Sequence, residues 1–288
     1  MTFRFVEAQN AVYPVIVLCR VLDVSRPGYY AWRKRQFDPS ARRQRDPVLQ
    51  TVLRKLHGDG RGVYGSPRLT VAAKAAGIAI GRHAVARLMR LEGLVGRCWS
   101  RRPRGAPAPA LVATAPNRLM RSFKQLVPNR VWVTDITYLP VKHGTLYLAV
   151  VLDLYARRVV GHAIADHMRT ELPLAALDMA LGQRGPVSGL LHHSDQGSQY
   201  SSHLYQEQLK KHGLIPSMSR RAQCWDNAVV ESFFGSLKSE LDLPRRHQTP
   251  DQVKAKVFDY IEVFYNRQRL HSFNGYRTPA QAEAEAIC

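Results

Sequence analysis

The sequence is poor in acidic residues relative to basic ones. Its 288 residues include 22 Asp and Glu against 42 Lys and Arg, so the formal net charge at pH 7 is +20. The hydrophobic fraction of 45% is too high for a chain that is mostly disordered. A folded protein with so large a positive excess is expected to bind a polyanion, and nucleic acid is the first candidate.

Cysteine is also rare, and the four that are present are Cys19, Cys98, Cys224 and Cys288. None lies within four residues of another, which excludes a CxxC-type zinc or redox pair and fits free thiols in a reducing compartment. The longest uncharged apolar run, 146–152, is too short to span a bilayer, and residues 1–20 lack the cleavage site of a signal peptide. We therefore expect a cytoplasmic protein without membrane contact.

The positive charge is concentrated in the first part of the chain. Residues 1–124 hold 24 Lys and Arg and 6 Asp and Glu, a net charge of +18, whereas residues 125–288 hold 18 and 16, a net charge of +2. A change of composition on this scale marks a functional boundary near Lys124.

Residues 1–46 are predicted to form a small helical segment followed by a linker. Two short helices are expected at 15–22 and 28–35, with Ser25 capping the second. They are compatible with a helix-turn-helix and equally with a helical hairpin that packs on a partner. The polar and basic stretch 36–46 ends in Asp-Pro and is predicted to be the linker.

Residues 47–100 are predicted to be a helix-turn-helix-like DNA-binding region. One helix is expected at 66–76, where Gly77 ends it, and a second at 82–92 after a short turn. The apolar positions of the second helix are Val85, Leu88, Met89 and Leu91. An ordinary solvated basic face is the alternative, but the net charge of +18 in this part of the chain favours DNA contact. The basic residues predicted to contact DNA are Arg82, Arg87 and Arg90.

The rest of the chain is predicted to contain a basic linker rich in Pro and Ala at 101–124, an α/β core at 125–241 and a helical extension at 242–288. Strands are expected at 131–139, 145–153, 157–165, 189–193 and 214–218. Helices are expected at 170–183, 201–212, 226–241 and 251–268. Three hairpin-linked strands followed by alternating helices and strands predict a mixed five-stranded sheet with flanking helices.

Three carboxylates occupy informative positions in this core. Asp135 lies in the middle of an otherwise apolar strand, where a charge is unfavourable unless it is paired, exposed or metal-bound. Asp195 directly follows a short buried strand, and strand ends of this kind form ligand sites. Glu231 follows Asp195 after 35 intervening residues and is expected on a helix. Taken singly, each of these three acids could be an ordinary surface or capping group. The nearby Asp226, which is not one of the three, is predicted to be such a group, the N-cap of its helix.

The combination fits phosphodiester transfer. That reaction uses two Mg²⁺ ions about 3.5–4 Å apart to activate the attacking oxygen and to stabilise the leaving one. Mg²⁺ prefers hard oxygen ligands, which carboxylates supply. Three acids from a strand centre, a strand end and a helix can converge on one point, so the sequence predicts a two-metal site at Asp135, Asp195 and Glu231.

The motifs around these acids resemble those of the second-frame transposases of bacterial insertion sequences. They read WVTDITY, LYLAVVLDLYARRVVG, HSDQGSQY, CWDNAVVESFFGSLKSE and YNRQRLHSFNGYRTPA. The resemblance covers nearly the whole chain and is closest over 127–280. It departs from the usual pattern at His162, where Trp is common, and at Gln196, where Arg is common.

The resemblance implies a ribonuclease-H-like, integrase-type core and an acidic triad that matches Asp135, Asp195 and Glu231. It implies Mg²⁺-dependent DNA strand transfer, with Mn²⁺ as a substitute ion, in which both aspartates bridge two metals and the glutamate binds the second. The implied partners are double-stranded DNA at the element ends and target, further copies of the chain on that DNA, and a protein from the upstream reading frame. The implied location is the bacterial cytoplasm, in association with the nucleoid.

Several neighbours of the acids have two interpretations. Lys238 lies two helical turns after Glu231 and is predicted to contact DNA phosphate rather than solvent alone. His193 and Ser194 are predicted to be packing groups, while the roles of Trp225 and Asn227 are left open between helix positioning and DNA contact. In the tail, a polar cluster is predicted to pack on the core and to contact DNA through Arg269. Its other members are Tyr265, Asn266 and His271.

Three other functions compete with transposition. A DNA-binding regulator would have no reason to carry the acidic triad. A nuclease or junction resolvase of the same fold would stop after hydrolysis, without joining DNA. A decayed copy is disfavoured by the intact triad.

Overall fold

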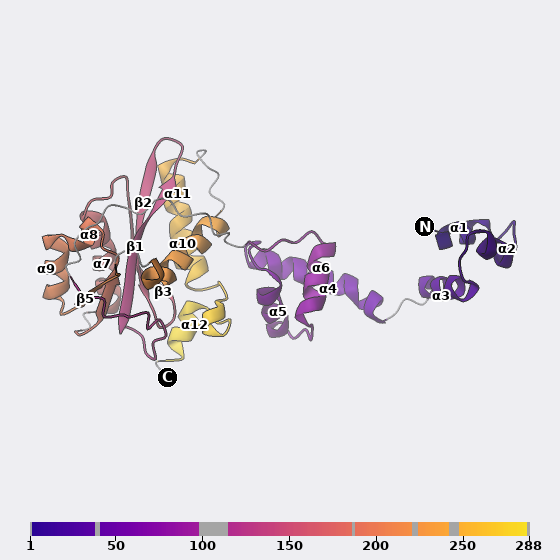
Figure 1. Ribbon diagram of the computed structural model, residues 1–288, viewed down its shortest axis with the longest axis horizontal. Helices are drawn as coiled ribbons and strands as arrows, with labels where there is room; N and C mark the ends of the chain where they lie inside the picture. Colours follow the sequence, from indigo (N-terminus) through magenta and orange to yellow (C-terminus); the bar gives the residue numbers. More distant parts are fainter. Residues whose placement is uncertain are drawn as a thin grey trace. The chain divides into compact units, whose positions relative to one another are not determined.

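The computed structural model describes residues 2–37, 41–97, 115–185, 188–220, 224–241 and 248–286, with side chains described for all of these except 41–43 and 224–225 (Figure 1). The chain divides into two compact units. The first consists of Met1–Gly62 and Leu69–Val95, and the second of Val63–Arg68 and Gly96–Cys288. In these described ranges no helix is both long and apolar enough to cross a membrane.

The first unit starts with three short helices, α1 Thr2–Gln9, α2 Val15–Val21 and α3 Arg26–Phe37. Their small core contains Val6, Leu18, Cys19 and Tyr29. The predicted cap is confirmed, because Ser25 Oγ accepts a hydrogen bond of 3.2 Å from the backbone N–H of Gly28 in the first turn of α3.

Three more helices complete the first unit: α4 Ala41–Asp59, α5 Ser66–Ala75 and α6 Arg82–Leu91, although the first residues of α5 belong to the second unit. The linker predicted at 36–46 was wrong over its second half, because α4 begins at Ala41 and continues through Pro47. A proline inside a helix removes one backbone hydrogen bond. The residue before this proline, Asp46, pairs with Arg87 on α6 at 2.7 Å.

The second unit contains a mixed sheet of five strands, as predicted. The strands are β1 Val131–Pro140, β2 Thr145–Asp153, β3 Arg158–Ala165, β4 Leu191–Ser194 and β5 Ile215–Met218. Their order is β3-β2-β1-β4-β5, with antiparallel pairing from β1 to β2 and from β2 to β3. β4 pairs in parallel with both β1 and β5. Because β2 is almost entirely buried, the centre of the sheet is covered on both faces.

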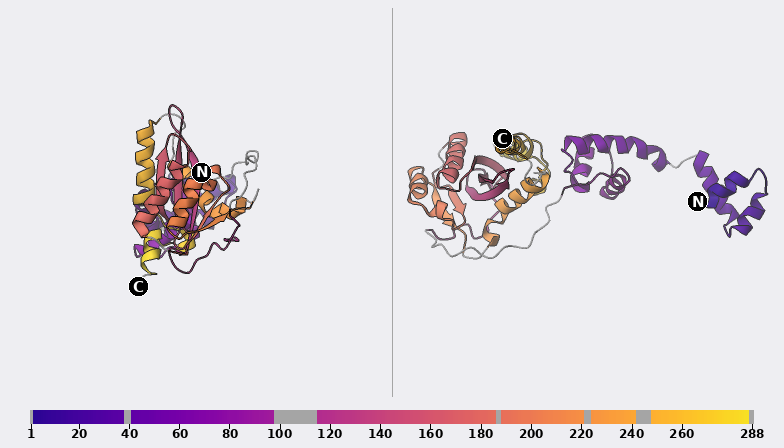
Figure 2. Two further views of the ribbon diagram at one scale, coloured as in Figure 1. Left: turned by 90° about the vertical axis from the view of Figure 1, so that its left-hand side faces the viewer. Right: turned by 90° about the horizontal axis from the view of Figure 1, so that it is seen from above.

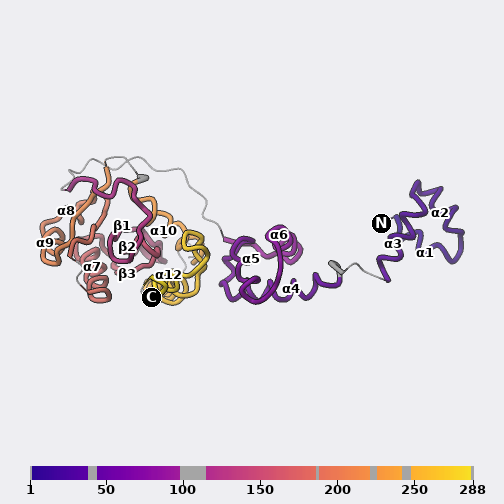
Figure 3. Tube along the Cα trace, turned by 90° about the horizontal axis from the view of Figure 1, so that it is seen from below, coloured from indigo at the N-terminus to yellow at the C-terminus, as the bar shows by residue number. Residues whose placement is uncertain are grey.

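Helices cover the two faces of this sheet (Figures 1 and 2). On one side lie α7 Glu171–Arg184, α8 Ser198–Ser201 and α9 His203–Lys211. On the other side lie α10 Ala228–Glu240, α11 Pro250–Phe258 and α12 Pro279–Ala284. The view in Figure 3 shows β1 and β2 between these two groups. The α7–α9 layer and the sheet share one core, which includes Trp132, Val151, Leu177, Tyr205 and Leu209.

Residues before β1 belong to the second unit and pack on it. The predicted linker ran from 101 to 124, and its first part, up to 114, lies outside the described residues. Leu119 is buried, and the backbone N–H groups of Arg118 and Leu119 donate to Ser217 Oγ at 2.9 and 3.3 Å. The predicted linker therefore ends too late, because residues 115–124 are held by β5.

The helix predicted at 251–268 is two elements. α11 ends at Phe258, and the chain continues as a π-helix, η2 Asp259–Tyr265. A π-helix has a wider turn than an α-helix. The residues buried by this turn are Tyr260, Ile261, Phe264 and Tyr265. The chain then passes through the 3-10 helix η3 Ser272–Asn274 to α12, and Asn274 Nδ2 donates to Ala156 O at 2.7 Å.

Gly161 on β3 sits where the sheet and α7 approach most closely. A Cβ at this position would lie 2.1 Å from Ala176 O and 2.9 Å from the backbone nitrogen of Ala180. We expect Gly161→Ala to lower the free energy of unfolding by about 1–3 kcal/mol, because the clash forces β3 and α7 apart. Urea unfolding followed by tryptophan fluorescence measures this loss.

Gly182 provides the matched control, since it lies on α7 and a Cβ at this position would have nothing within 4 Å of it. Gly182→Ala should leave the stability unchanged or raise it by up to about 1 kcal/mol, as expected for helix propensity. Equal effects of the two substitutions would contradict the packing argument.

Candidate active site

The parallel pairing of β1 with β4 places Asp135 and Asp195 opposite each other in the register of the two segments. Val133 is the register partner of His193, and the same register two residues later places Asp135 opposite Asp195, directly after the end of β4. Side chains at alternate positions of paired strands share one face, and neighbouring strands are about 4.8 Å apart. The two carboxylates are therefore neighbours on one face of the sheet.

The face that carries Asp135 is the one covered by α10. Its neighbour Thr134 is fully buried, and Thr134 Oγ1 lies 3.3 Å from the hydroxyl of Tyr200 on α8, so Thr134 faces the α7–α9 layer. Because successive side chains of a strand point to opposite faces, Asp135 points towards α10. Glu231 lies in the first turn of that helix.

A buried amide fixes the start of α10 against β1. Asn227 is 6% exposed, and its Nδ2 donates to Thr134 O at 3.2 Å. The bond joins the residue before the helix to the strand residue that precedes Asp135. Of the two roles left open for Asn227, helix positioning is therefore the one that the geometry supports, while the side chain of Trp225 lies outside the described residues.

The pKa values of Asp135 and Asp195 are both raised. The pKa of Asp135 lies well above its ordinary value, first because of burial and then because of Asp195, with a smaller contribution from Glu231. The N–H of Ile136, which donates to Asp135 Oδ1 at 2.8 Å, acts in the opposite direction. Burial also raises the pKa of Asp195, although the N–H of Gly197 donates to it at 2.9 Å. The three acids thus share one electrostatic neighbourhood.

Within the described parts of the chain, no three His, Cys, Asp or Glu side chains are placed closely enough to enclose a metal ion. Mg²⁺ does not need such a cage, because proteins commonly hold it through one or two carboxylates together with waters and substrate phosphates. The residues present fit this mode, since a divalent cation would remove the repulsion that raises the pKa of Asp135.

Lys238 faces the same acids from further along α10. Its side chain reaches solvent, and its positive charge lowers the pKa of Asp135. Partial desolvation lowers the pKa of Lys238 itself, while Asp135 acts against that shift. A cation on the helix that carries Glu231 therefore lies near Asp135, while its contact with DNA phosphate stays a prediction.

Asp226 has a different role from the predicted one. The N-cap position of α10 is occupied by Asn227, whereas Asp226 lies one residue earlier in the 3-10 helix η1 Cys224–Asn227. Its side chain is 1% exposed and pairs with Arg121 at 2.8 Å and Arg220 at 3.0 Å. Hydrogen bonds from Arg220, and then from Arg121, hold the pKa of this carboxyl well below its ordinary range. The N-cap prediction was wrong because the carboxylate is bonded instead to Arg220, six positions earlier, and to Arg121, 105 positions earlier.

The two histidines before Asp195, His192 and His193, are buried packing groups, which is one of the roles predicted for His193. His193 Nδ1 lies 2.9 Å from Ser217 Oγ, and His193 Nε2 lies 3.3 Å from Ser219 Oγ. Burial lowers the pKa of His193 to about 4 and that of His192 to about 3. Both rings are therefore neutral at pH 7.

Arg269 does not have the geometry of a DNA contact. Its side chain is 4% exposed and forms a bidentate pair with Glu240, with Nε and Nη2 at 2.7 and 2.6 Å from the two carboxylate oxygens. The backbone around it is held by Tyr64, whose hydroxyl donates to Gln268 O and accepts from Leu270 N, both at 3.0 Å. The predicted packing role is supported, and the predicted DNA contact fails because the guanidinium is buried and already paired.

Models of two protein families match this chain. The integrase core domain matches residues 126–224 and, in a second model, residues 231–285, and an HTH-like domain matches residues 43–104. The chain is 41% identical over 265 residues to an insertion element IS600 31 kDa protein of Shigella sonnei, covering 91% of this chain and 96% of the relative. It is 38% identical over 289 residues to the transposase InsF for insertion sequence IS3A of Escherichia coli strain K12, covering 98% of both.

The chain belongs to the IS3 family of insertion-sequence transposases. Solved structures with a similar course of the backbone include two retroviral ones. The simian T-cell lymphotropic virus intasome in complex with PP2A regulatory subunit B56 gamma matches with a TM-score of 0.47 and 17% identity, over 80% of this chain and 73% of that one. The HTLV-2 integrase catalytic core domain in complex with magnesium matches with a TM-score of 0.43 and 20% identity, over 55% of this chain and 98% of that one.

In the first unit of the transposase, the basic residues predicted to contact DNA differ in their surroundings. Arg82 and Arg90 are exposed on α6, while Val85, Leu88 and Met89 on its other side are buried. Arg87 is already paired with Asp46. Leu91 was predicted to belong to the apolar stripe but is 63% exposed.

His162 and Gln196, the two positions where a departure from the family pattern is expected from the sequence, both have local partners. His162 Nε2 lies 3.2 Å from Glu262 Oε1, and Gln196 Nε2 donates to Ser219 O at 2.9 Å. Neither contact disturbs the acids.

Sequence reasoning missed the buried hydroxyls behind Asp135. Tyr200 lies between Thr134 and Tyr205, and its pKa is raised first by burial and also by Tyr205, Asp135 and Asp195. Tyr205 in turn contacts His192 Nε2 at 3.2 Å. The one available signal was the pair of tyrosines in adjacent helical segments, which is common in apolar cores.

Asp135→Asn should stabilise the transposase in metal-free buffer at pH 7. The folded-state pKa of Asp135 is raised above its unfolded value, so the ionised carboxylate destabilises the fold, and this penalty disappears as the pH falls below the ordinary Asp range. We expect the free energy of unfolding to rise, because the neutral amide of Asn does not carry this penalty. Urea unfolding at several pH values measures it.

The control is Asp251→Asn on α11, where the carboxylate is 92% exposed and stability should not change. Added Mg²⁺ should stabilise the wild type more than Asp135→Asn. Equal stabilisation of both by Mg²⁺ would show that Asp135 does not hold the ion.

Proposed function

We propose that this transposase cleaves the ends of its insertion sequence and joins the resulting 3′-OH groups to DNA by Mg²⁺-dependent phosphodiester transesterification. The observation that carries the proposal is the register of β1 with β4, which places Asp135 opposite Asp195 directly after β4, with Glu231 on the helix that covers the same face. A DNA-binding regulator would gain nothing from Asp195 and Glu231 placed close enough to Asp135 to raise its pKa.

The proposed reaction has two steps, and in each of them one P–O bond forms while another breaks. Water attacks a phosphodiester at the element end, one P–O bond forms, another breaks, and a 3′-OH is released. That 3′-OH then attacks a second phosphodiester, so its oxygen becomes bonded to phosphorus and a different 3′-oxygen leaves. Because one P–O bond replaces another, no external energy source and no covalent protein–DNA intermediate are required.

The chain's own residues have separate tasks in this reaction. Asp135, Asp195 and Glu231 are the proposed ligands of two Mg²⁺ ions, which supply activation of the attacking oxygen and stabilisation of the leaving one. Lys238 would bind a DNA phosphate beside the acids and thereby offset their negative charge. Asn227 holds the start of α10 against β1.

The proposed partner is double-stranded DNA, at the element ends and at the target. Arg82 and Arg90 are exposed in the HTH-like domain and would bind phosphates. Arg87 stays a predicted DNA contact that must share its guanidinium with Asp46. Joining two ends requires several copies of the chain on the DNA, and we propose that a protein from the upstream reading frame, separate or fused, takes part. This activity belongs to the nucleoid in the bacterial cytoplasm.

Glu231→Gln tests the acidic triad. Labelled element-end DNA is incubated with Mg²⁺ and the chain, alone and fused to its upstream-frame protein, and joined products are separated on a gel. We expect the substitution to lower joining more than about 100-fold. Mutating a residue that only hydrogen-bonds to a metal ligand already lowers metal affinity or activity about 10–100-fold, and Glu231 is proposed to be a ligand itself. Glu207→Gln on α9 is the control, since that carboxylate is 61% exposed.

Each outcome separates one candidate function from another. Joining that survives Glu231→Gln would remove Glu231 from the site. Hydrolysis of the element end without joining by the wild type would favour a nuclease of the same fold.

The salt dependence of DNA binding tests the basic face of α6. Each phosphate contact contributes about 0.9 to the slope of log affinity against log salt concentration. Arg82→Ala and Arg90→Ala should each reduce the slope by about that amount, as measured by fluorescence anisotropy with element-end DNA. Arg54→Ala in the same unit is the control, because Arg54 pairs with Glu92. Unchanged slopes for both α6 variants would show that this face does not touch DNA.

A further inference from the structure

Asp226 is the most heavily bonded carboxylate described in the second unit. Its Oδ2 accepts from Asn117 Nδ2 at 2.8 Å, from Arg220 N at 3.1 Å and from Arg220 Nε at 3.0 Å. Its Oδ1 accepts from Arg121 Nε at 2.8 Å and from Arg220 Nη2 at 3.1 Å. The carboxylate is 1% exposed, whereas Arg121 and Arg220 are 41% and 49% exposed. A single buried charge thus ties together three segments of the chain.

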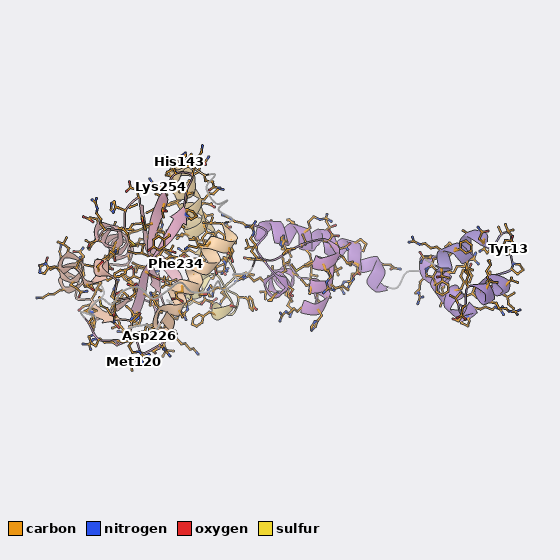
Figure 4. All side chains as sticks on the ribbon, turned by 45° about the horizontal axis from the view of Figure 1, so that its top comes forward. Tyr13, Met120, His143, Asp226, Phe234 and Lys254 are labelled. Carbon is orange, nitrogen blue, oxygen red and sulfur yellow. The ribbon has the colours of Figure 1, made fainter. Side chains whose placement is uncertain are left out.

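The first of these segments precedes β1 and is held in an uncommon conformation. Met120 and Arg121 have φ values of 48° and 62°, in the left-handed region that favours glycine. Asn117 Oδ1 accepts from Met120 N at 2.9 Å and so closes the turn. Figure 4 labels Met120 and Asp226 at the same end of the second unit. The bonds from Asn117 and Arg121 to Asp226 stabilise this turn.

The second segment follows β5 and is hydrogen-bonded to the residues on either side of Asp195. Ser219 N donates to Ser194 O at 2.9 Å, and Gln196 Nε2 donates to Ser219 O at 2.9 Å. Ser219 is therefore bonded to both neighbours of Asp195, and Arg220 follows it directly. Through Arg220, Asp226 is linked to the loop that carries the second aspartate.

The third segment is η1 itself, which leads into α10. Asp226 is followed by Asn227, whose amide binds β1 beside Asp135, and then by the first turn of α10 with Glu231. The proposed metal ligand comes five positions after the bonded carboxylate, a little more than one helical turn.

We propose that Asp226 is a positioning residue for the acidic site, which fixes the first turn of α10, and with it Glu231, against the loop of Asp195. This inference rests on the proposed function, because it assigns a purpose to the placement of Glu231. Asp226 itself does not touch DNA or metal. Its two arginines act through it, as counter-charges that keep a buried carboxylate in one position.

The experiment compares Asp226→Asn with wild type and with Asp251→Asn, whose carboxylate is 92% exposed. Three quantities are measured on the full chain: the joining rate at saturating DNA, the dissociation constant for element-end DNA, and the Mg²⁺ concentration for half-maximal joining. We expect Asp226→Asn to lower the rate about tenfold or more and to raise the Mg²⁺ requirement about tenfold, with DNA affinity within about twofold of wild type. Asp251→Asn should match wild type in all three.

A readout independent of activity is amide hydrogen exchange without DNA or metal. Asp226→Asn should speed exchange in residues 226–232 and leave α7 unchanged. Wild-type protein that fails to join DNA would defeat the proposed function, whereas localised exchange in the variant would still support the positioning role.

Arg220→Ala is the second variant, in case Asp226→Asn does not fold. It should reproduce the raised Mg²⁺ requirement in weaker form, because Asp226 keeps its bonds to Asn117, Arg121 and the backbone of Arg220. Two results would overturn the proposal. One is an unchanged Mg²⁺ requirement in both variants; the other is a loss of DNA affinity alone, which would assign Arg121 and Arg220 to direct phosphate contact.

Discussion

Parallel pairing of β1 with β4 places two carboxylates side by side, and their repulsion must be held in check by the surrounding fold. Asp135 on β1 lies opposite Asp195, directly after the end of β4, and each has a raised pKa. Left alone, such a pair would push the two strands apart. Hydrogen bonds around the pair oppose this repulsion. Asp226 holds the loop after β5 through Arg220, and the amide of Asn227 holds the start of α10 against β1.

The positive charge of the chain is only partly available to DNA. The formal net charge of +20 counts every arginine as if it met solvent. Arg269 is buried against Glu240, and Arg157 is buried with its guanidinium 4.0 Å from the ring centre of Phe273. Burial lowers the pKa of Arg157 to about 10. Part of the basic content of the core is therefore structural, and only exposed residues such as Arg82 and Arg90 can add to the attraction for DNA.

The sequence was sufficient to predict the five strands and most helices, because alternation, turn residues and apolar periodicity are local. It also identified the three acids, since their motifs and spacing are specific. The partners of single charges could not be predicted in this way. Asp226 and Arg269 have ordinary local surroundings, and their roles depend on residues 105 and 29 positions away. Helix α4 Ala41–Asp59 was not predicted at all, and Pro47, a residue that normally ends a helix, lies inside it.

The order of the site along the chain has a consequence during synthesis. Asp135 and Asp195 belong to strands that can pair once β4 has left the ribosome, but Glu231 follows Asp195 after 35 further residues, and Glu240, which anchors the far end of its helix, pairs with Arg269. A nascent chain that stops before this arginine has the paired aspartates without a fixed third acid. Emergence of the C-terminal segment therefore determines when a newly made molecule can first hold all three acids in place.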